Sequence, residues 1–150
     1  MLIYIGADHR GFQLKESLKN YLKESGYEVV DVGNDKYVPT DDYPDFAALA
    51  ARKISLDSEN SRGILICGSG VGVDVAANKF KNVRSALAFN TEQAATSRSD
   101  DNANVLSLAA DYLNEEDAKK ILSVWLATSF SGEERHQRRL RKIEDIEERN

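Results

Sequence analysis

The amino-acid sequence predicts an α/β protein: a five-stranded parallel sheet with helices on both faces, followed by an extra C-terminal helix. Two observations on its 150 residues support this class. Short apolar runs alternate with segments of helical periodicity, and five strand–helix repeats of this kind are typical of a parallel sheet. No linker, low-complexity tract or sequence repeat interrupts them, so residues 1–150 are expected to form a single domain.

Five short apolar runs are predicted to be the strands of this sheet. They span residues 2–6, 27–33, 63–67, 84–89 and 104–109. Because parallel strands end at one common edge, the polar residues that follow them are expected to gather there. Ligands bind at this edge in folds of the same class. Asp8 and His9 follow the first strand, Cys67 ends the third, and Asn90 follows the fourth.

The segments between the strands have the periodicity of amphipathic helices. A first helix is predicted at residues 12–25, and Gly26 supplies its stop. Pro44 suits the first turn of the second helix, a short alanine-rich helix follows the third strand, and Asn114 can cap a later helix. A charged helix begins near residue 133. The expected apolar faces are Leu14, Leu18, Tyr21, Leu22; Phe46, Leu49, Ala50, Ile54; Ile121, Leu122, Trp125, Leu126; and Leu140, Ile143, Ile146.

Composition and charge argue against several classes of protein. The formal net charge is −5, which disfavours a general nucleic-acid-binding role. No apolar run approaches the roughly 20 residues that span a bilayer, so no membrane association is expected. The N-terminal segment also lacks the basic flank of a signal peptide. One cysteine cannot form an internal disulfide, and we therefore expect a protein of the reducing cytoplasm.

The segment GILICGSGVGVDVAANK (63–79) contains the only cysteine of the chain. Cys67 closes a predicted strand, and Gly68, Gly70 and Gly72 follow it directly. These glycines let the backbone bend tightly and leave N–H groups free to face a ligand. The positive end of the next helix favours an anion at the same place, and a thiolate is accessible in such surroundings.

Three other interpretations of this loop compete with a ligand site. A dinucleotide-binding loop needs G-x-G-x-x-G, usually after the first strand, whereas the third glycine here comes one position early and after the third strand. A phosphate-binding P-loop needs a lysine directly after its last glycine, and Lys79 lies far from Gly72. A tight packing turn, with Cys67 as a small buried side chain, explains the loop equally well when the loop is taken alone.

Six segments taken together resemble one known family. They are GADHRGFQLK (6–15), DDYPDFA (41–47), GILICGSGVGVDVAANK (63–79), NVRSALAF (82–89), NANVLSLA (102–109) and RHQRR (135–139). In this order they resemble the sugar-phosphate isomerases that include type B ribose-5-phosphate isomerase and the galactose- and allose-6-phosphate isomerases. The resemblance covers essentially the whole chain. It implies a Rossmann-like three-layer α/β/α sandwich, a homodimer or tetramer with shared active sites, and neither a metal nor a cofactor.

The resemblance also implies roles for single residues. Cys67 is expected to be the base that moves a proton between C1 and C2 of the sugar, and the backbone of the glycine loop is expected to stabilise the enediolate oxygen. Arg135 and Arg139 match phosphate-binding arginines that reach a site in the partner subunit. From the residues alone, this pair also fits a solvated helix surface. Asp8 and His9 match residues that contact the sugar and its phosphate end. The expected substrate-binding residues are Asp8, His9, Tyr43, Gly68, Ser69, Gly70, Val71 and Gly72.

Three acidic residues depart from the family pattern. In SRSDDNAN (97–104), Asp100 stands where the family has the histidine credited with ring opening. Asp101 replaces an asparagine that contacts substrate, and Asp111 aligns with an arginine near the phosphate. Each change makes the site more negative. We expect Asp100 to take over the acid–base role with lower efficiency, Asp101 to stay near the substrate, and Arg10 to supply positive charge for the phosphate.

The favoured function is the interconversion of ribose 5-phosphate and ribulose 5-phosphate in the pentose phosphate pathway. Two alternatives remain open: isomerisation of another sugar phosphate, or sugar-phosphate binding with weak catalysis. Retention of Cys67 and of every loop glycine favours catalysis. Asp41 and Asp42 are expected to form a turn, although Asp42 could also face the pocket, and His136 is expected to be structural.

Overall fold

The computed structural model describes residues 1–150 and is built around one sheet of five parallel strands. The strands lie in the order β2-β1-β3-β5-β4, which confirms the predicted sheet. The edge strand β4 is shorter than the predicted run 84–89. The bounds are β1 Leu2–Ala7, β2 Glu28–Asp31, β3 Ser61–Cys67, β4 Ser85–Leu87 and β5 Val105–Ala109.

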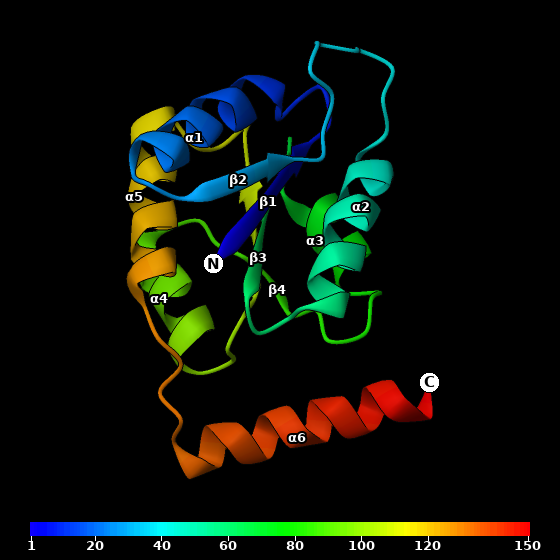
Figure 1. The fold of residues 1–150 in the computed structure, drawn as a ribbon, viewed down its shortest axis with the longest axis vertical. Helices are drawn as coiled ribbons and strands as arrows, with labels where there is room; N and C mark the ends of the chain where they lie inside the picture. The colour runs from blue at the N-terminus through cyan, green and yellow to red at the C-terminus, as the bar shows by residue number, and fades with distance from the viewer.

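Helices cover both faces of this sheet and form the predicted three-layer sandwich (Figure 1). One face carries α1 (Phe12–Glu24) and α5 (Glu115–Ala127), with α4 (Thr91–Ser99) packed against α5. The other face carries α2 (Tyr43–Leu56) and α3 (Val71–Ala77). The last helix, α6 (Glu134–Arg149), lies apart from both layers at one end of the molecule (Figure 1). No helix combines the length and apolarity needed to cross a bilayer.

The helix α6 lies near the residues that precede β4 and β5. Glu147 accepts hydrogen bonds from the Asn82 backbone N–H at 3.0 and 3.1 Å, and the Ser131 backbone N–H donates to the Ser99 carbonyl. The loop 32–42 after β2 lies at the opposite end (Figure 1). The helix therefore flanks the amino-terminal edge of the sheet, whereas ligands of such folds bind at the carboxyl edge.

Two predicted apolar faces differ from the observed ones. Leu49 of α2 is 48% exposed, and the alanines of this helix pack against the sheet in its place. Small side chains let α2 approach the strands closely, so the larger leucine stays outside. On α6, Leu140 is buried, but Ile143 and Ile146 are 45% and 60% exposed. The face of α6 that carries them is thus left largely uncovered within one chain.

Hydrophobic periodicity does not predict helix α4, because this helix has almost no apolar stripe. Its buried residues are Ala94 and Arg98. The Arg98 guanidinium donates to the carbonyls of Ala103 and Thr128 and lies 5.6 Å from the centre of the Trp125 ring. Burial lowers the pKa of Arg98 to about 10. A buried guanidinium with carbonyl partners, rather than an apolar face, thus docks this helix.

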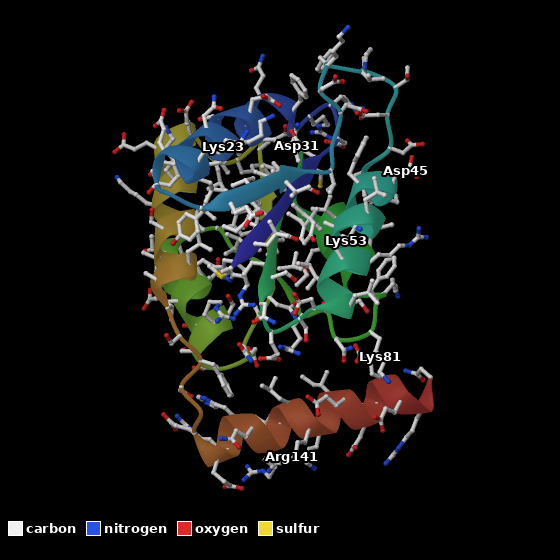
Figure 2. All side chains as sticks on the ribbon, in the orientation of Figure 1. Lys23, Asp31, Asp45, Lys53, Lys81 and Arg141 are labelled. Atoms are coloured by element: carbon white, nitrogen blue, oxygen red, sulfur yellow. The ribbon has the colours of Figure 1, made fainter.

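A fully buried lysine anchors the start of the loop that follows β2. The ammonium of Lys15 lies 2.5 Å from a carboxylate oxygen of Asp31 and 3.0 Å from the carbonyl oxygen of Asn34. Glu16 and Lys19 complete the cluster. Asp31 is labelled in Figure 2 at the end of β2, next to α1. Because a buried ammonium needs charged or carbonyl partners, this cluster fixes the path of the chain after Asp31.

The carboxylate of Asp31 makes stability depend on pH. Burial alone would raise the pKa of Asp31, but hydrogen bonds from Lys15 and Lys19 outweigh burial and hold that pKa below its ordinary value. A lower pKa in the folded state gives stability that is complete above the unfolded-state pKa of about 3.9 and is lost as the pH falls through the folded-state value.

We therefore expect Asp31→Asn to lower the free energy of unfolding by about 2 kcal/mol near neutral pH, since the Lys15 ammonium loses a charged partner. The loss should shrink at about pH 3, below the unfolded-state pKa, because the unfolded chain there binds a proton that the folded carboxylate still excludes. Urea unfolding at both pH values measures the difference. Asp35→Asn, in the same loop and without an ion pair, is the matched control. An equal loss at both pH values would contradict the argument.

Candidate active site

The cysteine loop is held in place by the residues that directly follow strand β5. The Cys67 carbonyl accepts a hydrogen bond from the Ala110 N–H at 2.9 Å, and the Gly68 carbonyl accepts one from the Asp111 N–H at 3.0 Å. Cys67 is buried, with 4% of the residue exposed. Gly70, at φ +74°, turns the chain into α3. Loop N–H groups that donate to no protein acceptor are those of Gly68, Ser69, Gly70 and Gly72.

A cavity of about 300 Å³ opens over this loop. It brings together residues that follow β1, the start of α2 and the cysteine loop, as predicted for the common edge of the sheet. Its lining is Asp8, Arg10, Tyr43, Cys67, Gly68, Ser69, Val71 and Gly72. These residues are named here the cysteine cluster. A cavity of this size with a thiol, a carboxylate, a guanidinium and free N–H groups suits a small polar anion.

Two side chains shape the wall of this cavity. The Tyr43 ring lies so close to Gly72 that a Cβ there would come within 2.7 Å of it. The Arg10 guanidinium lies over Gly68 and forms an ion pair with Asp111. Arg10 therefore lines the cavity, and Asp111 balances its charge. Asp8 is buried, and its Oδ1 accepts the N–H groups of Arg10 and Gly11.

His9 lies beside the cavity, between two residues that line it, and its partner is Asp41. The Oδ1 atom of Asp41 accepts the His9 backbone N–H at 2.7 Å and lies 2.9 Å from the ring atom Nδ1. Sequence reasoning treated Asp41 only as a turn former. Asp42, its neighbour, is exposed and makes no side-chain hydrogen bond as N-cap of α2. No local signal separates the two aspartates, because the contact with His9 spans 32 positions.

The other predicted site residues gather at the amino-terminal edge of the sheet. Asp100 ends α4, accepts the Ser99 hydroxyl at 2.6 Å and lies 3.9 Å from Nδ1 of the buried His136. Arg135 and Arg139 are exposed in the first turns of α6. Asp101 lines a separate cavity of about 420 Å³ against α6. We name Asp100, Asp101, Arg135 and Arg139 the α6 cluster.

The cysteine cluster and the α6 cluster do not meet within one chain. No residue of the α6 cluster lines the cavity over Cys67. The larger cavity beside α6 contains no thiol and no free glycine loop, so its size does not make it the better candidate for catalysis. Asn90 follows β4 as predicted but does not line the cavity over Cys67, and its side chain accepts the Gln93 N–H as N-cap of α4. No group of three His, Cys, Asp or Glu side chains is placed to hold a metal ion.

A model of the family described as Ribose/Galactose Isomerase matches residues 3–143. The chain belongs to this family. The resemblance that the six sequence motifs indicated is thereby confirmed. The ribose/galactose isomerase fold also agrees with the three-layer sandwich built on five parallel strands.

Named members of the ribose/galactose isomerase family align over nearly the whole chain. A probable ribose-5-phosphate isomerase B of Mycoplasma genitalium is 45% identical over 141 residues, which are 94% of this chain and 92% of that protein. The ribose-5-phosphate isomerase B of Mycobacterium tuberculosis is 37% identical over 98% of this chain and 90% of its own length.

A solved structure gives the same fold. The crystal structure of ribose-5-phosphate isomerase B from Mycoplasma genitalium with bound ribulose 5-phosphate superposes with a TM-score of 0.96 at 44% identity. The match covers 99% of this chain and 97% of that one. The fold of the ribose/galactose isomerases is therefore present here in full.

Proposed function

We propose that this chain is an aldose–ketose isomerase that interconverts ribose 5-phosphate and ribulose 5-phosphate. The observation that carries the proposal is the cavity in which Cys67 adjoins a loop of free backbone N–H groups. The relationship to ribose-5-phosphate isomerase B, including the structure with bound ribulose 5-phosphate, supports this substrate. We further propose that residues 1–150 act as one isomerase domain and that the enzyme works in the cytoplasm.

The chemistry follows from the groups in the cavity. The Cys67 thiolate takes the proton from C2 of the open-chain aldose and returns it to C1, while the proton on O2 moves to O1. The C1 aldehyde thus becomes an alcohol and the C2 alcohol becomes a ketone. Between the two transfers the sugar is an enediolate, and the free N–H groups of the loop stabilise its oxygen. Asp8 and Tyr43 hold the sugar against the loop.

A second chain completes the site in this proposal. A sugar phosphate needs fixed positive charge at one end, and Arg135 and Arg139 offer paired donors on one helical face. They belong to α6, beside the amino-terminal edge of the sheet, whereas Cys67 ends β3 at the carboxyl edge, and Arg139 makes no ion pair. We propose a homodimer or tetramer in which the α6 cluster of one subunit faces the cysteine cluster of its partner. Asp100 then serves as the acid–base group for ring opening.

One observation favours a second function, that of a sugar-phosphate-binding protein with weak catalysis. The Arg10 guanidinium is paired with Asp111, which leaves less positive charge at the cavity for a phosphate. The conversion of another sugar phosphate, such as allose 6-phosphate or galactose 6-phosphate, is the remaining alternative.

NMR of ribose 5-phosphate with the protein in D₂O separates these functions. The proposed isomerase gives ribulose 5-phosphate and deuterium at C2 of the recovered aldose. Parallel samples contain allose 6-phosphate and galactose 6-phosphate, and calorimetry measures the affinity for each sugar. Binding without conversion would establish the binding protein, whereas conversion of a hexose phosphate alone would change the assigned substrate.

The ion pair between Arg10 and Asp111 leads to a prediction about substrate affinity. Asp111→Asn frees the Arg10 guanidinium for the phosphorylated substrate, so we expect KM for ribose 5-phosphate to fall by about two- to fivefold, as for an exposed ion pair. Arg10→Ala should raise KM, and kcat should change little in both variants. Asp117→Asn, which removes an exposed carboxylate from α5, is the control. A KM that stays unchanged in Asp111→Asn would show that Asp111 does not compete with the substrate.

A further inference from the structure

Both carboxylate oxygens of Asp41 have hydrogen-bond partners, which come from the segments around His9 and Asn34. Its Oδ1 atom accepts the His9 backbone N–H and faces the His9 ring atom Nδ1, at 2.7 and 2.9 Å. Its Oδ2 atom accepts the side-chain amide of Asn34 at 2.9 Å. The Asp41 side chain is only 9% exposed. Since a carboxylate can only accept, Nδ1 of His9 must carry a proton.

The geometry leaves the other ring nitrogen of His9 free. No protein atom is hydrogen bonded to Nε2, and the His9 side chain is 27% exposed. Asp8 and Arg10, the two chain neighbours of His9, both line the cavity over Cys67. In a neutral imidazole with its proton on Nδ1, Nε2 carries a lone pair and is a hydrogen-bond acceptor.

The support behind Asp41 reaches the buried core. The side-chain amide of Asn34 donates to Asp41. The backbone carbonyl of Asn34 accepts a hydrogen bond from the ammonium of the fully buried Lys15 at 3.0 Å. Lys15 in turn pairs with Asp31 at the end of β2. On the outer side, the Tyr37 ring meets the His9 ring edge-on at 6.3 Å. The carboxylate is therefore held by the fold and is not a mobile surface group.

We propose that Asp41 is a positioning residue of the active site. It fixes His9 in the Nδ1–H tautomer, so that Nε2 accepts a hydrogen bond from a hydroxyl of the bound sugar. A carboxylate that locks the tautomer of a histidine through its other nitrogen is a recurring arrangement in catalytic and metal sites. The assignment of a sugar to this site rests on the proposed function, whereas the tautomer of His9 does not.

Nitrogen NMR of histidine-labelled protein tests the tautomer without substrate. The chain has two histidines, so the His9→Gln variant assigns both rings. Near neutral pH we expect His9 to carry its proton on Nδ1 and a bare Nε2. In Asp41→Ala the proton should move to Nε2, the tautomer that a free neutral imidazole prefers, whereas Asp42→Ala should leave the ring unchanged. A wild-type His9 with a proton on Nε2, alone or together with Nδ1, would overturn the proposal.

Kinetics then test what the tautomer does. Asp41→Ala should raise KM for ribose 5-phosphate by about three- to tenfold, the value of one hydrogen bond, with a smaller change in kcat. In a His9→Ala background the same substitution should have almost no further effect, since Asp41 acts through His9. An equal effect in both backgrounds would show a purely structural role. If ribose 5-phosphate is not converted at all, the proposed function fails, but the tautomer measurement still decides the role of Asp41.

Discussion

Replacement of Cys67 by alanine is expected to lower kcat for ribose 5-phosphate by about 10²- to 10⁴-fold, the contribution of a positioned general base. The thiol adjoins the loop of free N–H groups, and it accepts no hydrogen bond from the backbone. Asp8, the other candidate, accepts two backbone N–H groups at one oxygen. Exchange of the C2 proton in D₂O should be lost together with turnover.

The control for this variant must separate chemistry from packing. Cys67 is nearly buried, so its truncation also removes contacts from the core between the sheet and α2. Val73→Ala removes buried volume from the same core outside the loop. It should cost stability in urea and leave kcat within about threefold of wild type. A Cys67→Ala enzyme with near-normal kcat would show that the thiol is only a packing group.

A mixture of two inactive variants is expected to regain activity if the active site is shared. Cys67→Ala removes the base from the cysteine cluster, and Arg139→Ala removes a phosphate ligand from the α6 cluster. In a heterodimer of the two variants, one of the two sites receives both wild-type groups. Random exchange in a two-fold dimer gives heterodimers in half of the molecules, so about one quarter of wild-type activity should return.

A matched mixture controls for unspecific recovery. Arg135→Ala and Arg139→Ala both alter the α6 cluster, so no heterodimer of these two chains contains an intact site, and mixing them should restore nothing. Subunit exchange is followed with differently tagged chains. Activity that stays absent in the first mixture, although exchange is complete, would place the whole site within one chain and refute the shared arrangement.

The strands and the cysteine loop could be predicted because their signals are local. Apolar runs marked every strand, and a thiol followed by three glycines marked the loop. The pairs that give the site its detail are not local. His9 and Asp41 are 32 positions apart, and Arg10 and Asp111 are 101 apart. The sequence contains several aspartates that could pair with His9 or Arg10, and only the folded positions of the loops decide which aspartate does so.

Two errors of detail have a similar physical cause. Leu49 is more hydrophobic than alanine, yet three alanines of α2 pack against the sheet together with Phe46 and Ile54, and Leu49 lies on the outer side. Helix α4 was not predicted from hydrophobic periodicity, because a buried guanidinium and not an apolar stripe holds this helix in place. Hydrophobic periodicity reports how apolar a face is, but the available volume and the hydrogen-bond partners depend on the assembled layers.

The order of the strands also governs how the nascent chain can fold. β4 leaves the ribosome before β5, yet β5 is its only neighbour in the sheet. The first three strands can pair while synthesis continues, whereas β4 must wait for residues 105–109. The carbonyls of Cys67 and Gly68 also lack their hydrogen-bond donors until this part of the chain is made, because the donors are the N–H groups of Ala110 and Asp111. The cysteine loop is thus completed only late in synthesis, when the C-terminal third of the chain docks onto an existing half-sheet.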